Sequence, residues 1–316
     1  MKKLGWLLFL ISVCIVTGCR STVLSDGQLV SGQTAKFIVG FTNSNNMNLA
    51  EMQRADAFVK YAKSYPEIEV SLLDAQNNIN KQLDQIDEFI ARKVNVIVLQ
   101  ALDSREIAPG VKKANAAGIP VIALGSQVSD SAVTFIGVPN YDAGKMQGDF
   151  MRERLPLHAR IVYLQGTRGL YHAEERWQGF KTALLDKRPD IRVLDSLSGN
   201  YDRAEGLKLM ECWNSIFGQV DAVIAANDQM ALGAIEVLKA ANRLRGVLVS
   251  GVDGQKEALQ AIQAGEMSQT IFQDTDGMGK ACFEVIQSIK KGETPPKEIM
   301  VPFKPVTKDN ISEYVK

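Results

Sequence analysis

A regular alternation of short apolar runs and helical-period segments, beginning at residue 36, is the feature that most constrains the fold. Residues 36–41, 67–73 and 94–100 are apolar runs of strand length, and the segments 49–64 and 80–92 between them have the spacing of amphipathic helices. Strands that alternate with helices in this way indicate βαβ units built around parallel sheets. The chain is therefore predicted to have an α/β fold.

The rhythm continues to the C-terminus and divides into two series. The first series ends with a helix over 106–117, a strand over 119–124 and an extended segment over 133–138. The second series has its expected elements at 142–153, 158–164, 173–186, 191–196, 203–217, 220–226, 229–241, 246–252, 256–264, 267–272, 275–290 and 298–302. Asp202 fits a helix N-cap, and Gly265 and Gly292 fit helix C-terminal caps. Two series predict two Rossmann-like lobes.

No flexible linker separates the two series near Val138-Pro139. With 316 residues the chain is long enough for about two domains. A short crossing without a Gly, Ser or Pro tract favours two lobes hinged over one cleft rather than independent domains on a string.

The first eighteen residues have the composition of a targeting segment. Lys2-Lys3 is a basic n-region, and residues 4–16 form an apolar stretch that is short for a membrane span. Val16-Thr17-Gly18-Cys19 resembles the lipobox of bacterial lipoproteins, although Leu is more usual than Val three residues before the Cys. The resemblance implies that Cys19 is lipidated and becomes the mature N-terminus; plain secretion with cleavage nearby is the alternative. Residues 19–35, rich in Ser, Thr, Gly and Gln, are expected to be a flexible tether.

Composition excludes several functions. Lys plus Arg and Asp plus Glu both number 36, so no basic face for nucleic acid or membrane lipid is evident. The chain has only two histidines, which cannot assemble a zinc site of the usual spacings. Cys14 leaves with the signal segment. Cys212 and Cys282 lie on expected helices among apolar neighbours and are predicted to be buried, unpaired thiols, with a disulfide or metal pair as the alternative.

Polar groups follow six of the expected strands, at the edge of an open α/β sheet where ligands bind. They are amides, carboxylates and one guanidinium, a set that suits a small, neutral, hydroxyl-rich molecule. The groups are Asn43–Asn46, Asp74–Asn78, Arg176, Asn227-Asp228, Asp253-Gly254 and Gln273.

Each of these groups also has a plainer interpretation. The Asn-rich turn at residues 43–46 can simply cap a helix, and Asp253-Gly254 can be an ordinary turn. Arg176, beside two glutamates, can be a solvated ion-pair residue. Tyr201 and His172 can be half-buried surface groups. Their common position at strand ends is what favours a binding site.

Motifs for catalysis are absent from the sequence. Neither G-x-x-x-x-G-K-[ST] nor G-x-S-x-G occurs, and no nucleophile with a base accompanies the polar groups. Gly166-Thr167-Arg168-Gly169 follows a strand but lacks the further glycine and acidic residue of a dinucleotide site. The chain is therefore predicted to bind a ligand without an enzymatic step, a cofactor or a metal.

Three stretches carry a resemblance to a known family. Leu73-Asp74-Ala75-Gln76-Asn77-Asn78, the segment Asn227-Asp228-Gln229-Met230-Ala231-Leu232-Gly233-Ala234 and Gly251-Val252-Asp253-Gly254 are similar to the periplasmic sugar-binding proteins of ABC importers, of the ribose- and galactose-binding type. The similarity runs from about Lys36 to Pro302. LacI-type repressors share this ligand-binding fold but begin with a helix-turn-helix, where this chain has a lipoprotein-like signal.

The resemblance implies a type I periplasmic binding protein with two lobes joined by three hinge strands. It places residues 36–138 plus 274–302 in the first lobe and 139–273 plus 303–316 in the second. Arg176 of Arg176-Trp177-Gln178-Gly179-Phe180 matches the arginine that donates to sugar oxygens. The other positions that match ligand-binding residues are Thr42, Asn46, Tyr201, Asn227, Asp253 and Gln273.

The chain departs from the family pattern at positions in the first lobe and at the residue before Asp253. Gly125-Ser126 stands where ribose-type members have Asp-Arg, Asn48-Leu49 stands where they have two aromatics, and Val252 replaces a Phe. Ser126 is retained as an expected ligand residue, and His172 falls at a pocket-lining position of galactose-type members. These departures predict a ligand other than ribose, such as a cyclitol, another sugar or a modified sugar.

The function expected from the sequence is that of an exported, lipid-anchored, monomeric solute-binding protein. It would capture a sugar, cyclitol or related polyhydroxylated ligand and hand it to an ABC permease. The alternative is a sensory module that signals to a chemoreceptor or a histidine kinase. A third interpretation, an exported enzyme on the same scaffold, lacks a catalytic constellation.

Overall fold

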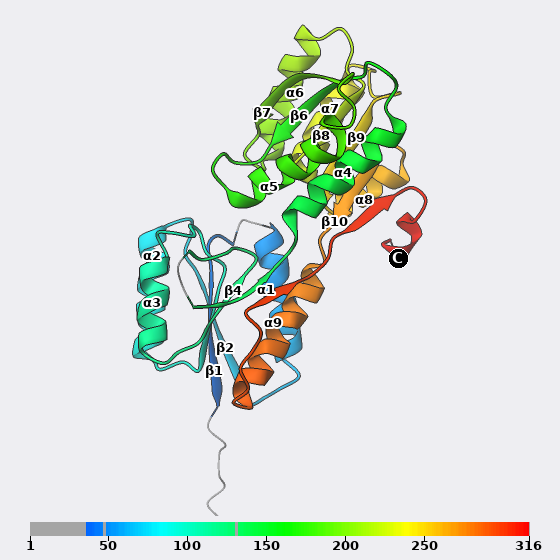
Figure 1. Cartoon of the computed structure of the whole chain (residues 1–316). Coiled ribbons are helices and arrows are strands. Elements are labelled where there is room, and N and C mark those ends of the chain that lie inside the picture. Colours follow the sequence, from blue (N-terminus) through cyan, green and yellow to red (C-terminus); the bar gives the residue numbers. More distant parts are fainter. Residues whose placement is uncertain (1–35, 47–48, 130–131, 316) are drawn as a thin grey trace, which may run out of the picture. The chain divides into compact units, whose positions relative to one another are not determined.

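The computed structural model describes residues 36–46, 49–129 and 132–315. The predicted signal segment, the tether and Cys19 lie outside these described residues. Within them, the chain forms two parallel-dominated sheets, and each sheet carries helices on both faces (Figure 1). No helix in this part of the chain combines the length and the apolarity that crossing a membrane requires.

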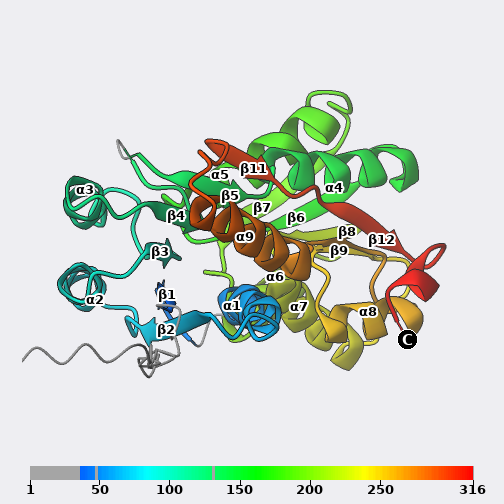
Figure 2. The same ribbon diagram turned by 90° about the horizontal axis from the view of Figure 1, so that it is seen from below.

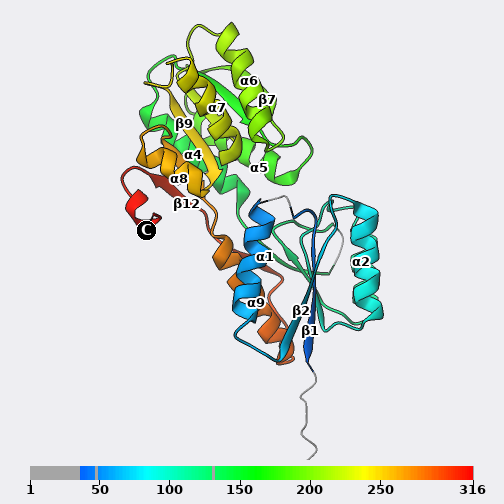
Figure 3. The same cartoon turned by 180° about the vertical axis from the view of Figure 1, so that it is seen from behind.

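The first sheet has the strand order β11-β5-β4-β3-β1-β2, and all its described pairs are parallel. Two cores lie on its two faces because successive side chains of a strand point to opposite sides. Val39 and Phe41 of β1 pack with α1 and α9, whereas Ile38 packs on the side of α2 and α3. Figure 3 shows α1 and α9 on one side of β1 and β2 with α2 on the other, and Figure 2 shows α2 beside α3. The elements are β1 (Phe37–Asn43), α1 (Leu49–Ala62), β2 (Ile68–Asp74), α2 (Ile79–Ala91), β3 (Val96–Leu99), α3 (Ala108–Ala116), β4 (Val121–Leu124), β5 (Thr134–Gly137), α9 (Thr275–Lys290) and β11 (Glu298–Met300).

The second sheet repeats this plan with the order β12-β10-β9-β8-β6-β7. Its strands are parallel except at the edge, where β12 runs antiparallel to β10. One core, with Trp213 and Met230, lies under α6, α7 and α8, and the other, with Tyr163 and Phe180, lies under α4 and α5. The elements are α4 (Asn140–Arg154), β6 (Arg160–Gln165), α5 (Tyr171–Phe180), β7 (Arg192–Ser198), α6 (Arg203–Ile216), β8 (Ala222–Ala225), α7 (Asp228–Ala240), β9 (Leu248–Asp253), α8 (Lys256–Gln263), β10 (Gln269–Phe272) and β12 (Lys304–Thr307).

The described chain passes between the two sheets at three places. It leaves the first sheet after β5 to enter α4, returns after β10 to enter α9, and leaves again between β11 and β12. The last of these passages is the extended red segment of Figure 1. The long helix α9 therefore belongs with α1 in the first lobe although it follows the second lobe's strand β10.

Several local predictions are confirmed by the backbone. The helix expected over 275–290 has those bounds. Asp202 caps α6 by accepting a hydrogen bond of 2.9 Å from the Glu205 amide. Gly265 and Gly292 have φ of +74° and +78°, in the left-handed region that follows many helices.

Three local features differ from the sequence prediction. The helix expected over 173–186 begins at Tyr171, and its α-helical part ends at Phe180 before a π-helical turn, Lys181–Leu185. Strand β12 lies in a tail for which no element was predicted. Cys212 is exposed rather than buried, because α6 turns Met210 and Trp213 inward and Cys212 lies about 100° away from Trp213 around the helix. Cys282 is buried as predicted, and both thiols are free.

Candidate functional site

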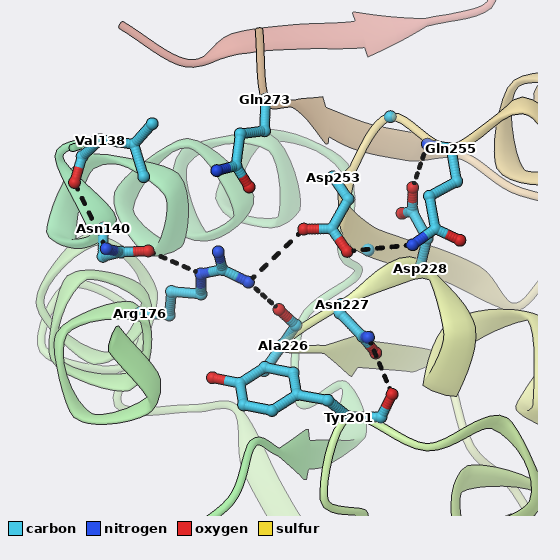
Figure 4. Close-up of polar contacts among 12 residues, drawn as sticks. Val138, Asn140, Arg176, Tyr201, Ala226, Asn227, Asp228, Asp253, Gln255 and Gln273 are labelled. Carbon is cyan, nitrogen blue, oxygen red and sulfur yellow. Dashed lines mark hydrogen bonds and ion pairs between the residues drawn. The ribbon is translucent and has the colours of Figure 1, made fainter. Parts of the chain in front are cut away.

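Arg176 lies at the centre of a buried polar cluster in the second lobe. Its Nε donates to Asn140 Oδ1 over 3.1 Å, and its Nη1 donates to the carbonyl oxygen of Ala226 over 2.5 Å. The same Nη1 lies 3.9 Å from Asp253 Oδ1, and the Arg176 side chain is only 6% exposed (Figure 4). The interpretation of Arg176 as a solvated ion-pair residue is therefore wrong.

Close packing of α4 against α5 fixes the backbone that carries Arg176. A Cβ at Gly144 of α4 would lie 1.8 Å from the carbonyl oxygen of Arg176, and one at Gly179 would lie 2.0 Å from the carbonyl oxygen of Tyr141. Because glycine has no side chain, the backbones of the two helices can come into direct contact at both positions. The π-helical turn that follows α5 is a feature often found at functional sites.

Asp253 ends β9 and projects toward Arg176 (Figure 4). Its φ of +122° is unusual for a residue with a side chain, and strain of this kind concentrates at functional sites. Burial raises the pKa of Asp253 to about 6, against the opposing charges of Arg176 and Arg54. The carboxyl group also accepts a hydrogen bond of 3.3 Å from Gln255.

Asp228, the first residue of α7, lies beside Asp253 but has a structural role. Its carboxylate accepts hydrogen bonds from the Gln255 amide over 2.8 Å and from Thr270 Oγ1 over 2.7 Å. Burial, and secondly the charge of Asp253, raise the pKa of Asp228. These bonds hold the loop after β9 against β10, so Asp228 supports the conformation that presents Asp253.

Tyr201 and His172 form an aromatic pair next to Arg176. Their ring centroids are 5.2 Å apart. The Tyr201 hydroxyl is buried and has no hydrogen-bond partner among the described residues. Burial, with the charges of Arg176 and Arg54, lowers the pKa of His172 to about 3, so the imidazole is neutral near pH 7. The pair therefore offers ring faces and neutral polar atoms.

Asn227 and Gln273 complete the second-lobe group. Asn227 caps α7, because its Oδ1 accepts from the Met230 amide over 3.0 Å, and its Nδ2 donates to the carbonyl oxygen of Tyr201 over 3.0 Å. The buried Gln273 side chain lies on the Arg176 side in Figure 4, and its Nε2 contacts Met278 Sδ at 3.5 Å. The structure thus brings all six second-lobe candidates together.

The three first-lobe candidates, Thr42, Asn46 and Ser126, differ in burial and in hydrogen bonding. The Thr42 hydroxyl is fully buried and donates to Gln85 Oε1 over 2.6 Å, which ties it to α2. Asn46 is exposed and accepts from Asn43 Nδ2 over 2.8 Å. Ser126 is half-buried directly after Gly125. A ligand contact by these three residues stays a prediction, and Thr42 would have to exchange its bond to Gln85 to make one.

Sequence reasoning missed Arg54, a buried guanidinium on α1. Its Nε donates to Gln100 Oε1 over 2.7 Å, and Gln100 Nε2 donates in turn to Asn43 Oδ1 over 2.7 Å. The charges of Asp253 and Arg176 both act on Arg54, which places it near the second-lobe cluster. A signal was present in the sequence, because Glu51, Arg54 and Phe58 fall on the buried stripe of the helix at spacings of three and four.

The assembled groups provide hydrogen-bond donors, hydrogen-bond acceptors and ring faces. No set of three or more His, Cys, Asp or Glu side chains is placed to hold a metal ion in the ranges that the structure describes. Arg176 and Asp253 supply charge-assisted hydrogen bonds to uncharged polar groups, and Tyr201 with His172 can cover the apolar face of a ring. Chemically, this arrangement suits the binding of a small polar molecule.

Comparison with known proteins agrees with that class. A family model described as "Periplasmic binding protein domain" matches residues 36–294. The ribose import binding protein of Bacillus subtilis is 30% identical to this chain over 96% of the chain and 98% of its own length. An ABC transporter solute binding protein of Bacillus halodurans with bound myo-inositol has a TM-score of 0.83 and 31% identity, covering 90% of this chain and 99% of that one. A fructose binding periplasmic domain of a hybrid two component system has a TM-score of 0.80 and 26% identity, covering 88% and 93%.

The chain belongs to the periplasmic binding protein family and has the type I fold of its structural neighbours. More narrowly, it is a sugar- or polyol-binding member of the solute-binding proteins of ABC transporters. The family consists of binding proteins rather than enzymes, and membership implies export to the periplasm.

Proposed function

We propose that this protein captures a cyclitol or a sugar other than ribose between its two lobes and delivers it to an ABC permease. The observation that carries the proposal is the buried Arg176–Asp253 pair. The pair lies at the carboxyl ends of the strands of the second sheet, the edge at which open α/β sheets bind ligands. A carboxylate with a raised pKa next to a guanidinium is held ready for hydroxyl groups, which can donate to the one and accept from the other.

The ligand is assigned to the cyclitols and non-ribose sugars because the first lobe departs from the ribose-type pattern. Gly125-Ser126 provides neither the charge nor the length of an Asp-Arg pair, and Leu49 provides no aromatic ring. One relative is a ribose import binding protein, and one structural neighbour has bound myo-inositol. The second-lobe residues around Arg176 and Asp253 suit both kinds of ligand, so residues of the first lobe would determine which of the two the protein binds.

The proposal includes export and anchoring. Residues 1–18 would be removed as a signal segment, Cys19 would carry the lipid, and residues 19–35 would tether the two lobes, with boundaries at 138/139, 273/274 and 302/303. The protein would work as a monomer that meets its permease at the membrane surface. Ligand would shift the lobes toward the closed state by its greater affinity for that state.

A sensory role is the second candidate, favoured by the likeness to the fructose binding domain of a two component system. The same ligand would then be read by a kinase or a chemoreceptor instead of a permease. Ligand uptake by cells that lack this protein separates the two functions. Loss of uptake supports transport, and intact uptake with a lost transcriptional response supports sensing.

The ligand proposal is tested by thermal unfolding of the purified protein without residues 1–20 in the presence of sugars, cyclitols and other small polar metabolites. A ligand at 100 times its Kd stabilises the folded state by roughly 2.7 kcal/mol, which gives a clear rise in Tm. We expect a cyclitol or a sugar other than ribose to raise the Tm. The proposal fails if only an unrelated metabolite does so.

A further inference from the structure

Arg54 occupies the space that the glycine at position 125 leaves open. A Cβ built on Gly125 would lie 2.8 Å from both Cζ and Nε of Arg54 and 2.9 Å from Nη2. Gly125 also has φ of +82°, which a residue with a side chain rarely adopts. Any larger residue here would push the guanidinium away. Gly125 stands where ribose-type members have a charged residue after β4. Its lack of a side chain leaves the space that the Arg54 guanidinium from α1 fills.

One end of the Arg54 guanidinium is fixed and the other end is available. Nε is bonded to Gln100, whose amide is itself held by Asn43 and by the backbone carbonyl of Glu51 at 2.9 Å. Nη1 and Nη2 have no hydrogen-bond partner among the described residues, although Arg54 is only 7% exposed. The two atoms are not among the fully buried polar atoms that lack a partner, so they keep contact with solvent and are free to donate to a ligand.

The charge of Arg54 acts on the second-lobe cluster. It opposes the rise in the pKa of Asp253 and contributes to the fall in the pKa of His172. Burial lowers the pKa of Arg54 itself, while the charges of Glu51 and Asp253 oppose that fall and Arg176 adds to it. Arg54 therefore faces the same region as Arg176 and Asp253, from the other lobe.

We propose that Arg54 is the first lobe's ligand-binding residue, and that its Nη1 and Nη2 donate to two neighbouring oxygens of the ligand. The planar fork of arginine matches such a pair, whereas a lysine presents a single point of charge. This inference rests on the proposed function, since it concerns the ligand of the same site. The two oxygens can belong to vicinal hydroxyls or to a carboxylate.

The test compares ligand affinity by calorimetry for the full chain and for Arg54→Lys, Gly125→Ala and the control Arg92→Lys. Arg92 is a partly exposed arginine at the end of α2, in the same lobe. The probes are myo-inositol, galactose and galacturonate, together with the deoxy analogues of whichever binds. We expect Arg54→Lys and Gly125→Ala each to weaken binding by about tenfold to a hundredfold, as for loss of a charged hydrogen bond, with Arg92→Lys unchanged.

The affinity for a ligand analogue that lacks one of the two oxygens distinguishes direct contact by Arg54 from a purely structural role of this residue. The full chain should bind this analogue weakly, and Arg54→Lys should then cost little further affinity, because the interaction is already lost. Tighter binding of galacturonate than galactose assigns a carboxylate to Arg54, and binding of myo-inositol or galactose assigns vicinal hydroxyls.

The outcomes separate the two proposals. If the full chain binds a probe and both Arg54→Lys and Gly125→Ala bind it equally well, the assignment of Arg54 is wrong while the proposed function stands. If the full chain binds no sugar, cyclitol or sugar acid, both proposals fail. Should Arg54→Lys unfold, as seen by circular dichroism, Gly125→Ala decides the matter because it moves the guanidinium without deleting it.

Discussion

Arg176 and Asp253 meet with Nη1 3.9 Å from Oδ1, although one comes from helix α5 and the other from the end of β9. The arginine is anchored through Nε to Asn140 and through Nη1 to the Ala226 carbonyl, and so presents a fixed charge. The carboxyl group has fewer bonds and keeps a raised pKa of about 6. Of the two, Asp253 is therefore the group whose state a ligand or the pH can change.

The stability of the ligand-free protein should fall as the pH rises through about 6. The pKa of Asp253 is raised from 3.8 to about 6, so its contribution is fully present below about pH 4 and is lost as Asp253 ionises. Asp253→Asn mimics the protonated carboxyl group. We expect this variant to be more stable than the parent at pH 8, by up to a few kcal/mol, and the difference to be smaller at pH 4.5, where most of the contribution is still present. Urea unfolding at both pH values measures this, and equal midpoints at pH 8 would contradict it.

Ligand affinity should have the opposite pH dependence. Ligand hydroxyls that donate to Asp253 favour its ionised form, so Kd should rise up to about tenfold for each pH unit below 6. His172 does not titrate in this range, because its pKa is lowered to about 3. Calorimetric titrations between pH 4.5 and 8 give the profile. In Asp253→Asn the binding should be weak and independent of pH, and a parental slope in that variant would assign the proton to another group.

Arg176→Ala should abolish the ligand-induced rise in Tm. The substitution removes the bonds to Asn140 and Ala226 and leaves the Asp253 carboxyl without its near partner, a loss worth about 3–5 kcal/mol for a buried pair. We expect the variant to fold with a lower Tm and no response to ligand. Glu174→Ala on the same helix is the matched control, since Glu174 is exposed and, among the described residues, its side chain accepts only from Gln178. A normal ligand response in Arg176→Ala would remove Arg176 from the site.

The second-lobe half of the site could be predicted because its signal is local. Asn227 and Asp253 follow or end buried strands, and parallel strands bring their carboxyl ends to one edge. Arg176 lies on α5 and is matched through the family's Arg-x-x-Gly-Phe segment. Both sheets could be predicted because the alternation of apolar runs with helical segments is also a local pattern in the sequence. Strand β12 escaped prediction because it is short and pairs only at an edge, where its exposed Lys304 and Pro305 carry no alternation.

The first-lobe half could not be predicted in the same way, because its signal is not local. Arg54 lies on a helix, and its place at the site depends on Gly125, which is 71 positions further along the chain. The sequence shows a lost Asp-Arg pair but not the arginine that enters the vacated space. Thr42 shows the converse problem, since its position at the end of β1 is right while its hydroxyl is taken by Gln85.

Cys19→Ser should release the protein from membranes. The lipid would be attached through the thiol, and the serine hydroxyl is not a substrate for that attachment, so the anchor would be lost while the folded domain begins unchanged at residue 36. Fractionation of cells that produce the parent and the variant measures the distribution. Ser21→Ala is the matched control and should stay in the membrane fraction. Retention of Cys19→Ser with the membranes would mean that the lipobox interpretation is mistaken.

Gly144→Ala should destabilise the protein and weaken ligand binding, although alanine is the better helix former by about 1 kcal/mol. The new Cβ would lie 1.8 Å from the carbonyl oxygen of Arg176, so α5 must move and overpacking should cost about 1–3 kcal/mol. Gly218→Ala is the control, because a Cβ there has nothing within 4 Å. Urea unfolding and calorimetry should therefore show a lower midpoint and a higher Kd for Gly144→Ala alone. If Gly144→Ala were instead stabilised, the contact between α4 and α5 would not be what positions Arg176.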